Sequence, residues 1–400
     1  MAGRGRDEMV LDELKRLAGQ YREKMIEHRV HLHMHPELPF CEKNTSAYVK
    51  KELERIGVPY VLCEGNYGIV ATVTGGKPGK NIGFRADMDA LEIQEANDVP
   101  YRSQVPGVMH ACGHDGHTAV LLGLAEALTE HKELVHGTVR LFFQPAEELA
   151  PGGAKSMVDQ GFADGLDEVF ALHFQGETET GTIRTTTGAI MANADSITVT
   201  IHGRGAHAAD PNLAADALLA GAAAVCALQN IVSRFLNPLD SAVVSICTFH
   251  SGEKVYNVLQ DKAVFLGTVR TFSAEARARI EEKIHTVLKG VCEIYGTTYE
   301  LEYEKGYPAV INDRQVSEQA VKAMERAGFH VEICRPDLGG EDFAYFLNHT
   351  PGCFAYIGCG NRNKGICASV HTPRFDIDED ALESALLCEL ALYGNAVGTF

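Results

Sequence analysis

The sequence lacks the features of several classes of protein. No stretch approaches the roughly 18 uncharged apolar residues that a membrane-spanning helix needs. The first residues, "MAGRGRDEMVLDELKRLAGQYREK", contain no apolar segment of a secretory signal peptide. We therefore predict a cytosolic protein that has no membrane partner.

Positive charge is scarce. The 36 Lys and Arg residues face 54 Asp and Glu residues, which gives a formal net charge of −18. A surplus of this sign repels nucleic acid and anionic membranes and favours solubility. The composition therefore argues against a nucleic-acid partner and leaves a small molecule as the expected ligand.

Paired cysteine motifs are also missing. The chain has 11 cysteines, an odd number, and none of them forms a C-x-x-C pair. A disulfide framework is therefore not expected, and most of the thiols should be reduced, small core residues.

What is present is an alternation of predicted strands and helices over 400 residues, a length that suggests two domains of unequal size. The alternation is typical of an α/β domain with a mostly parallel sheet. A charged amphipathic helix over residues 8–35 should end before Pro36. The "GGKPGK" segment, between the predicted strands "YGIVATVTG" and "NIGFRADMD", predicts a hairpin turn.

A second domain is expected within the first. Residues 190–305 have the pattern β-α-β-β-α-β, which is ferredoxin-like, with an Ala-rich helix over 212–235 and another helix over 274–295. We predict that this α+β domain is inserted in the larger domain, which would comprise residues 1–189 and 306–400.

The stretch "MHACGHDGHTA" contains several potential metal ligands directly before an apolar helical run. In a glycine-containing loop, Cys112 and His114 can converge on one ion. Alternatively, Cys112 could be a nucleophile whose pKa a helix N-terminus lowers, with His114 or His117 as its base. The third interpretation is a polar helix entry without chemistry.

Further candidates favour the metal site. Glu147 and Glu148 follow a predicted strand, and neighbouring like charges are costly unless a cation offsets them. His173 ends the predicted strand "EVFALH", and His371 precedes a Thr-Pro turn. Ligand sites in open α/β sheets form past the ends of strands. Together with Cys112 and His114 these donors are too many for one tetrahedral ion with an open position, but they suit two ions that share a water.

Other polar residues near these motifs have supporting interpretations. Asp87 and Asp89 are expected to orient ligands, because an imidazole ligand usually donates its other N–H to a carboxylate. His117 is expected to be structural. Three histidines near the end of the first helix are expected to form a polar helix end that packs near the site: His31, His33 and His35.

The motifs "HMHPEL", "FRADMDAL", "MHACGHDGHTA", "FQPAEE", "PGGAK", "GRGAHAA", "GGEDFAYF" and "HTPRFD" occur in one order along nearly the whole chain. In this they resemble the metal-dependent amidohydrolases and aminoacylases, the branch of the M20-type metallopeptidases that contains hippurate hydrolases and auxin-conjugate hydrolases. The resemblance implies a zinc-exopeptidase-like catalytic domain. It also implies that the inserted domain is a lid and dimerisation domain, which carries His207 and forms a homodimer.

The resemblance further implies roles for individual residues. Two divalent ions (Zn, Mn, Co or Ni) would be bound by five residues: Cys112, His114, Glu148, His173 and His371. Glu147 would be the catalytic carboxylate, taking a proton from a metal-bridging water, and His207 would help to stabilise the oxyanion. The expected reaction is hydrolysis of an N-acyl amino acid (N-acetyl, benzoyl or indolyl-acetyl type) to a carboxylate and a free amino acid.

Two alternatives stay open beside this reaction. A dipeptidase-like exopeptidase would recognise a free amino terminus, although "DMD" stands where the aminopeptidase branch has H-x-D. A non-catalytic metal-binding scaffold is disfavoured because Glu147 is present.

The sequence gives less information about which substrate is bound. An amino-acid carboxylate needs a cationic or amide partner, and Asn257 and Arg270 in the inserted domain are the candidates. Arg270 could equally be a surface charge at a strand end. The sequence departs from the family pattern at Cys41, where a glutamate is common, at Gln260, where a proline is usual, and in "ADPNLAAD", which lacks a common histidine. The acyl group and the amino acid therefore stay open.

Overall fold

The computed structural model describes residues 2–400, with side chains from Met9 onward, and it divides into two compact units. The first unit runs to Ile190 and includes Val310–Arg335 and Glu341–Phe400, and the second comprises Met191–Ala309 and Pro336–Gly340. The sequence places residues 336–340 with the larger domain. They group with the second unit, where the Ala192 amide donates to the Gly339 carbonyl over 3.0 Å.

The first unit is built on an eight-stranded sheet with the order β1-β2-β4-β3-β5-β16-β6-β15. Its strands are β1 (Tyr60–Leu62), β2 (Ile69–Thr74), β3 (Lys77–Asp87), β4 (His136–Gln144), β5 (Glu168–Glu179), β6 (Thr182–Thr185), β15 (His330–Ile333) and β16 (Gly352–Gly360). The β4-β3-β5-β16 centre and the β6–β15 pair are parallel. The predicted α/β class with a mostly parallel sheet is therefore confirmed.

The predicted hairpin between β2 and β3 is wrong. β4 lies between these strands, antiparallel to β2 and parallel to β3. The side chains of Leu141, Phe142 and Phe143 in β4 are fully buried. A strand this apolar is covered on both faces only in the interior of the sheet, and burial of its side chains outweighs the local turn signal of "GGKPGK".

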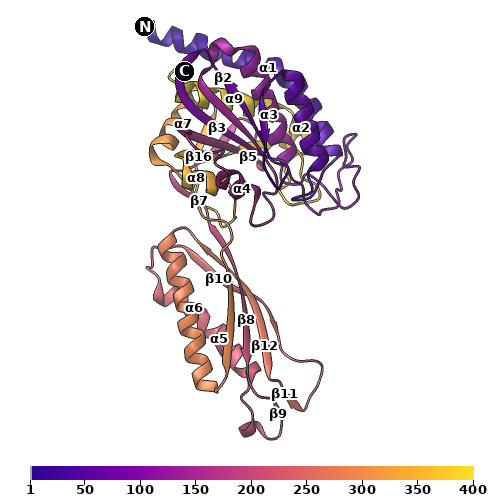
Figure 1. The fold of residues 1–400 in the computed structure, drawn as a ribbon, viewed down its shortest axis with the longest axis vertical. Helices are drawn as coiled ribbons and strands as arrows, with labels where there is room; N and C mark the ends of the chain where they lie inside the picture. Colours follow the sequence, from indigo (N-terminus) through magenta and orange to yellow (C-terminus); the bar gives the residue numbers. More distant parts are fainter. Residues whose placement is uncertain (1) are drawn as a thin grey trace. The chain divides into compact units, whose positions relative to one another are not determined.

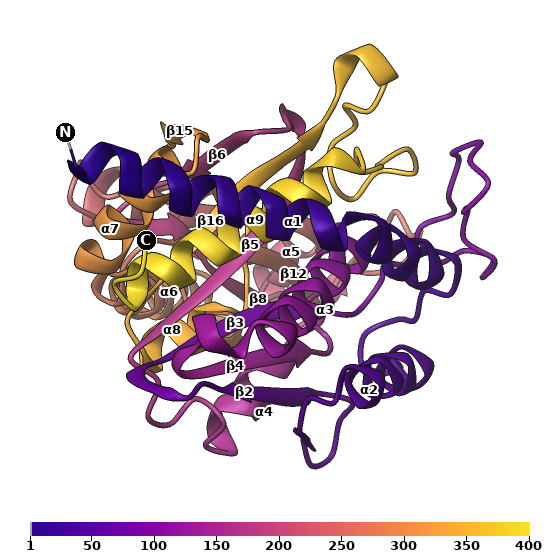
Figure 2. The same ribbon diagram turned by 90° about the horizontal axis from the view of Figure 1, so that it is seen from above.

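The helices of the first unit are α1 (Ala2–Met34), α2 (Lys43–Ile56), α3 (His114–Glu130), α4 (Gly153–Asp159), α7 (Arg314–Arg326), α8 (Ala344–His349) and α9 (Asp380–Ala396). α1 ends just before His35-Pro36, as proline requires of the residue before it. α3 contacts β3, α1 and α9, and α1 runs along α9 and α3 in Figure 2. Because α3 is covered on all sides, nearly all of its residues are buried.

The second unit has the element order β8 (Asn193–His202), α5 (Ala217–Leu228), β10 (Ala242–His250), β12 (Lys262–Thr271), α6 (Ala274–Tyr295) and β13 (Thr298–Glu304). Its four strands form an antiparallel sheet with the order β10-β12-β8-β13, and α5 and α6 pack on it (Figure 1). This is the βαββαβ order predicted from the sequence. In this unit β9 (Ala206–His207) also pairs with β11 (Val258–Leu259). Another two-stranded sheet, β7 (Gly188–Met191) with β14 (Val310–Asn312), belongs to the first unit apart from Met191.

The long Ala-rich helix expected over residues 212–235 is shorter. α5 begins after Asp216, whose side chain accepts the Leu219 N–H over 2.9 Å, and a separate π-helical turn follows at Ile231–Phe235. An aspartate that caps a helix satisfies one of its first free N–H groups, and so defines its start. The apolar periodicity continues across this break and conceals it in the sequence.

Two further features of the described residues concern the cysteines and the apolar helices. All 11 cysteines are free thiols, six of them buried. No helix within residues 2–400 is both long and apolar enough to cross a membrane.

Candidate metal centre

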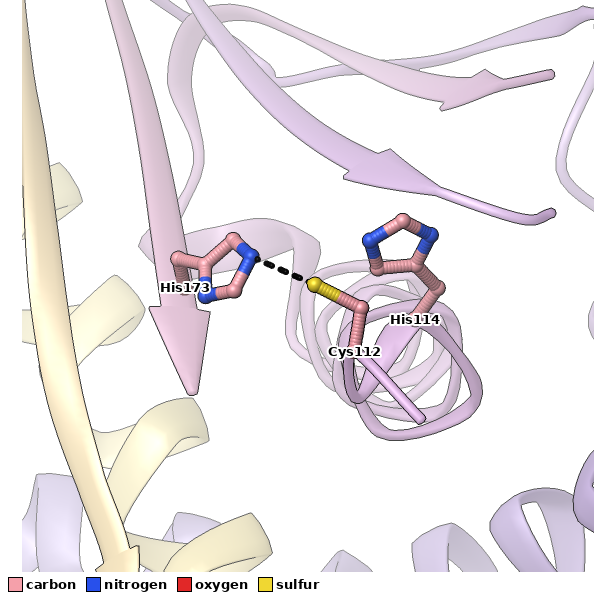
Figure 3. Close-up of side chains that lie close together, drawn as sticks. All are labelled: Cys112, His114 and His173. Atoms are coloured by element: carbon pink, nitrogen blue, oxygen red, sulfur yellow. Dashed lines mark hydrogen bonds between the residues drawn. The ribbon is translucent and has the colours of Figure 1, made fainter. Parts of the chain in front are cut away.

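The first unit brings together the six residues predicted to bind metal or to carry the proton. Cys112 and His114 lie at the N-terminus of α3 and His173 lies in β5, as Figure 3 shows. Glu147 and Glu148 follow β4. Possible ligand atoms lie within 4.8 Å of one another in three overlapping groups: Cys112, His114 and His173; Cys112, Glu148 and His371; and His114, Glu147 and Glu148.

The His173 ring turns its Nε2 atom, which could bind a metal ion, toward the Cys112 thiol. Its Nδ1 donates to the Phe174 carbonyl over 2.8 Å, so the proton of the neutral ring is on Nδ1 and Nε2 carries a lone pair. This Nε2 lies 3.3 Å from the Cys112 Sγ (Figure 3). Burial lowers the pKa of His173 well below its usual value. The imidazole is therefore neutral, which is the form that binds a metal ion.

The thiol environment argues against the reactive-thiol interpretation. Burial raises the pKa of Cys112 well above its usual value, and the carboxylates of Glu148 and Glu147 raise it further. A nucleophilic cysteine needs the opposite shift. A cation beside the thiol would offset these effects and favour the thiolate.

His114 has one nitrogen bound and one open. Its Nδ1 lies 3.0 Å from the Asp89 carbonyl and 3.1 Å from the Asp89 Oδ1, whereas Nε2 is buried without a hydrogen-bond partner. Burial by itself lowers the pKa of His114, but Asp87 and Asp89 raise it to about 10. The position therefore favours a positive charge, which a protonated imidazole or a bound cation supplies.

His117 is closed to a metal ion although it lies beside these residues. Its Nδ1 is 2.6 Å from the Asp87 Oδ1, and its Nε2 accepts the Phe174 N–H over 2.9 Å. Both ring nitrogens have protein partners, so no lone pair is left for a ligand bond. This arrangement agrees with a structural role.

His371 and Glu148 complete the group. The His371 Nε2 lies 2.9 Å from the Glu148 Oε1, and the His371 N–H donates to the Ala111 carbonyl over 2.7 Å. The second contact ties the His371 loop to the segment that carries Cys112. The expectation that every ligand follows a strand end is wrong, because His173 lies inside β5, which pairs with β16 as far as Glu179.

Sequence reasoning missed a buried charge network beneath the site. The Arg85 guanidinium binds Asp87 over 2.7 Å, and Glu341 and Asp342 each over 2.8 Å. Burial raises the pKa of Glu147 well above its usual value, and Glu341 is the largest further cause. The motifs "FRADMDAL" and "GGEDFAYF" contain these residues, but no local pattern shows that they meet.

A second network joins α1 to the segments that carry the candidate ligands. His33 is buried, with Nδ1 2.8 Å from the Asp115 Oδ2, and Arg29 lies 3.3 Å from the same oxygen. Arg29 also binds Asp376 over 2.5 Å, in the segment after His371. The predicted polar helix end therefore divides: His33 is part of the core beneath the site, whereas His31 and His35 are exposed.

The donor set fits divalent metal ions. It combines a thiol, imidazole nitrogens and carboxylates, the ligands that first-row transition metals share. The buried Nε2 of His114 has no hydrogen-bond partner and lies 3.5 Å from the Asp87 Oδ2, and the carboxylates around the ring favour a cation. The identity of the metal does not follow, since affinities for Zn, Mn, Co and Ni overlap at such sites.

The remaining predicted residues lie in the second unit. His207, in β9, is exposed, and its Nδ1 accepts the Ala209 N–H over 3.1 Å. A cavity of about 440 Å³ is lined by His207, Asn257 and Gln260 among others. Arg270, in β12, donates to the Asp195 carbonyl over 3.3 Å and is half-buried.

Comparison with known proteins agrees with this chemistry. The sequence pattern of the peptidase family M20/M25/M40 matches residues 83–392. An N-acyl-L-amino acid amidohydrolase of Geobacillus stearothermophilus is 40% identical over 324 residues, which are 80% of this chain and 87% of the relative. Thermostable carboxypeptidase 2 of Saccharolobus solfataricus is 36% identical over 386 residues, 96% of this chain and 98% of the relative.

A crystal structure shows the same fold. The Bacillus subtilis YXEP protein, described as a dinuclear metal binding peptidase from the M20 family, has a TM-score of 0.83 and 33% identity. The match covers 96% of this chain and 100% of that protein.

Proposed function

Because this chain belongs to the peptidase family M20/M25/M40, whose motifs its sequence resembles, we propose that it is a metal-dependent N-acyl-amino-acid amidohydrolase. It hydrolyses the amide bond of an N-acyl amino acid and releases a carboxylate and a free amino acid. The observation that carries this proposal is the convergence of a thiol, imidazoles and Glu148 beside the buried carboxylate of Glu147. The name of the Geobacillus relative supports the substrate class.

Five residues would hold two divalent ions: Cys112, His114, Glu148, His173 and His371. When bound, such ions polarise a carbonyl oxygen and lower the pKa of a shared water. Asp89 keeps the His114 ring in the orientation that leaves Nε2 open, and the Phe174 carbonyl does the same for His173.

Glu147 moves the proton. Its carboxylate accepts a proton from the attacking water and returns it to the departing amide nitrogen. Burial and the neighbouring Glu341 hold the pKa of Glu147 well above the usual range, which favours the protonated form of its carboxyl group. The same residue can therefore serve as base and then as acid.

The second unit supplies groups for the rest of the substrate. His207 stabilises the oxyanion, and Asn257 and Arg270 bind the amino-acid carboxylate. The unit acts as a lid and forms a homodimer. Sedimentation analysis should give twice the 43.4 kDa mass of the chain, and a monomer at working concentration would contradict the dimer.

His207→Ala is expected to lower kcat roughly 100- to 1000-fold, the effect of losing one oxyanion donor, with an unchanged metal content. Steady-state kinetics and metal analysis of the purified variant check this. His285→Ala, on the exposed side of α6, is the matched control and should keep the wild-type kcat. Loss of metal from the His207 variant would instead make His207 a ligand.

The second candidate is an exopeptidase that acts on free peptides. It is favoured by the similarity to the Saccharolobus carboxypeptidase. Such an enzyme recognises a peptide amino or carboxyl terminus, whereas an amidohydrolase accepts a simple acyl group. Pairs of free and N-acylated substrates with the same terminal amino acid separate the two.

The deciding experiment measures amino-acid release from N-acetyl, N-benzoyl and indolyl-acetyl amino acids and from free dipeptides. The enzyme is stripped of metal and resupplied with Mn, Zn, Co or Ni. We expect metal-restored cleavage of one or more acyl amino acids. Preferential cleavage of free dipeptides would support the exopeptidase, and no release with any metal would refute the proposed function for these acyl groups.

A further inference from the structure

The turn that carries Glu147 has a strained backbone. Ala146 directly precedes Glu147 and has a φ of 53°, the left-handed conformation. A residue with a Cβ atom rarely adopts this conformation, and it persists only where surrounding contacts hold it. The direction of the Glu147 side chain depends on this conformation, because the peptide between the two residues follows from it.

Carboxylates hold this turn on both sides of Glu147. The Glu42 Oε1 accepts the Ala146 N–H over 2.8 Å, and the Asp89 Oδ2 accepts the Glu148 N–H over 2.9 Å. Hydrogen bonds from backbone N–H groups to carboxylates are stronger than those to neutral acceptors. Asp89 also binds His114, so it has a second function, whereas the Glu42 carboxylate binds the Phe40 and Ala146 N–H groups, neither of which belongs to a proposed ligand.

The position of Glu42 directly before α2 does not explain its burial. Glu42 is the residue before the first turn of α2, but its side chain does not cap the helix. The side chain is fully buried. Its Oε1 accepts the N–H groups of Ala146 over 2.8 Å and of Phe40 over 3.0 Å, whereas its Oε2 is buried without a hydrogen-bond partner. Burying a carboxylate costs free energy. The contact with the Ala146 N–H, in the turn of Glu147, is the one that offsets part of this cost and reaches the candidate site.

We propose that Glu42 is a positioning residue, which holds Ala146 in its left-handed conformation and thereby fixes the Glu147 carboxylate. This inference rests on the role of Glu147 in the proposed function. It does not place Glu42 in contact with substrate or metal.

Glu42→Ala should lower kcat roughly 10- to 100-fold, the effect of displacing a reacting group by about 1 Å. KM and the metal content should stay at wild-type values, because the proposed ligands do not contact Glu42. Glu42→Gln keeps an oxygen that accepts the Ala146 N–H, so it should restore most of kcat. Glu52→Ala is the matched control: it removes a buried carboxylate of α2 that binds Arg55, and should lower the Tm without changing kcat.

A second variant tests the backbone conformation itself. Glycine adopts a left-handed φ without the Cβ penalty, so Glu42→Ala should cost less kcat in an Ala146→Gly background than in the wild type. Equal losses in the two backgrounds, an unchanged kcat in Glu42→Ala, or loss of metal from that variant would each overturn the inference.

Hydrogen exchange gives a readout that needs no substrate. In the metal-loaded protein, the Ala146 amide should exchange faster in Glu42→Ala and at the wild-type rate in Glu42→Gln. Wild-type exchange in Glu42→Ala would contradict the inference even if no acyl amino acid were cleaved. Absence of turnover in the wild type would refute the proposed function alone.

Discussion

Glu147→Ala is expected to lower kcat by roughly 100- to 10000-fold, the contribution of a positioned proton carrier, while the metal content stays at the wild-type value. The metal stays because a thiol, imidazoles and Glu148 supply the ligands without it. The rate falls because the neighbouring carboxylate, Glu148, is a proposed metal ligand and so cannot replace Glu147 as the proton carrier. Steady-state kinetics with the best acyl amino acid, together with metal analysis of the same preparation, measure both effects.

Two controls separate proton transfer from metal binding at the glutamate pair. Glu147→Gln keeps the shape of the side chain but cannot accept the proton, so it should be as slow as the alanine variant. Glu148→Ala should instead lose metal, because Glu148 lies with Cys112 and His371. A near-native rate in Glu147→Ala would refute the assignment, and loss of metal from it would make Glu147 a ligand.

Chelation of the metal is expected to remove all turnover, and resupply of a suitable divalent ion should restore it. Without an ion the site holds a protonated thiol, because burial and the Glu148 and Glu147 carboxylates raise the pKa of Cys112. Binding must therefore release this proton, so the apparent metal affinity should rise with pH and fall as the pH is lowered. Equilibrium dialysis at several pH values measures the effect.

Variants of the ligands test the same centre. Cys112→Ala and His114→Ala should not recover activity at metal concentrations that restore the wild type. His285→Ala, remote from the first-unit ligands in sequence and placed in the second unit, should recover like the wild type. Full turnover of the chelated enzyme would exclude a metal-dependent reaction.

Much of the fold could be read from local patterns. α6 spans residues 274–295 as predicted, because Ser273 caps it and Gly296 ends it in the left-handed conformation. α1 ends before Pro36 for the same kind of local reason. The prediction of a β2–β3 hairpin was wrong, since the place of β4 in the sheet depends on burial and not on the adjacent residues. The prediction of one long Ala-rich helix was wrong because the apolar periodicity continues across the end of α5.

The site divides in a similar way. The candidate site residues could be named from the sequence because Cys112, His114, Glu147 and Glu148 lie in short motifs with unusual chemistry. The sequence did not predict the contacts of Arg85 with Glu341 and of Glu42 with Ala146, because these contacts join residues far apart in the sequence. Neither partner of such a pair has a local pattern that names the other.

The sequence by itself determined the kinds of donor atom, the α/β class and the family resemblance, because residue identity and short-range periodicity are sufficient for these. The tertiary structure decided which nitrogen of each histidine is open. His114 and His173 are held through Nδ1 and present Nε2, whereas both nitrogens of His117 are bound. It also decided the charge of the site, since burial and opposed carboxylates shift pKa values only after distant segments have packed together.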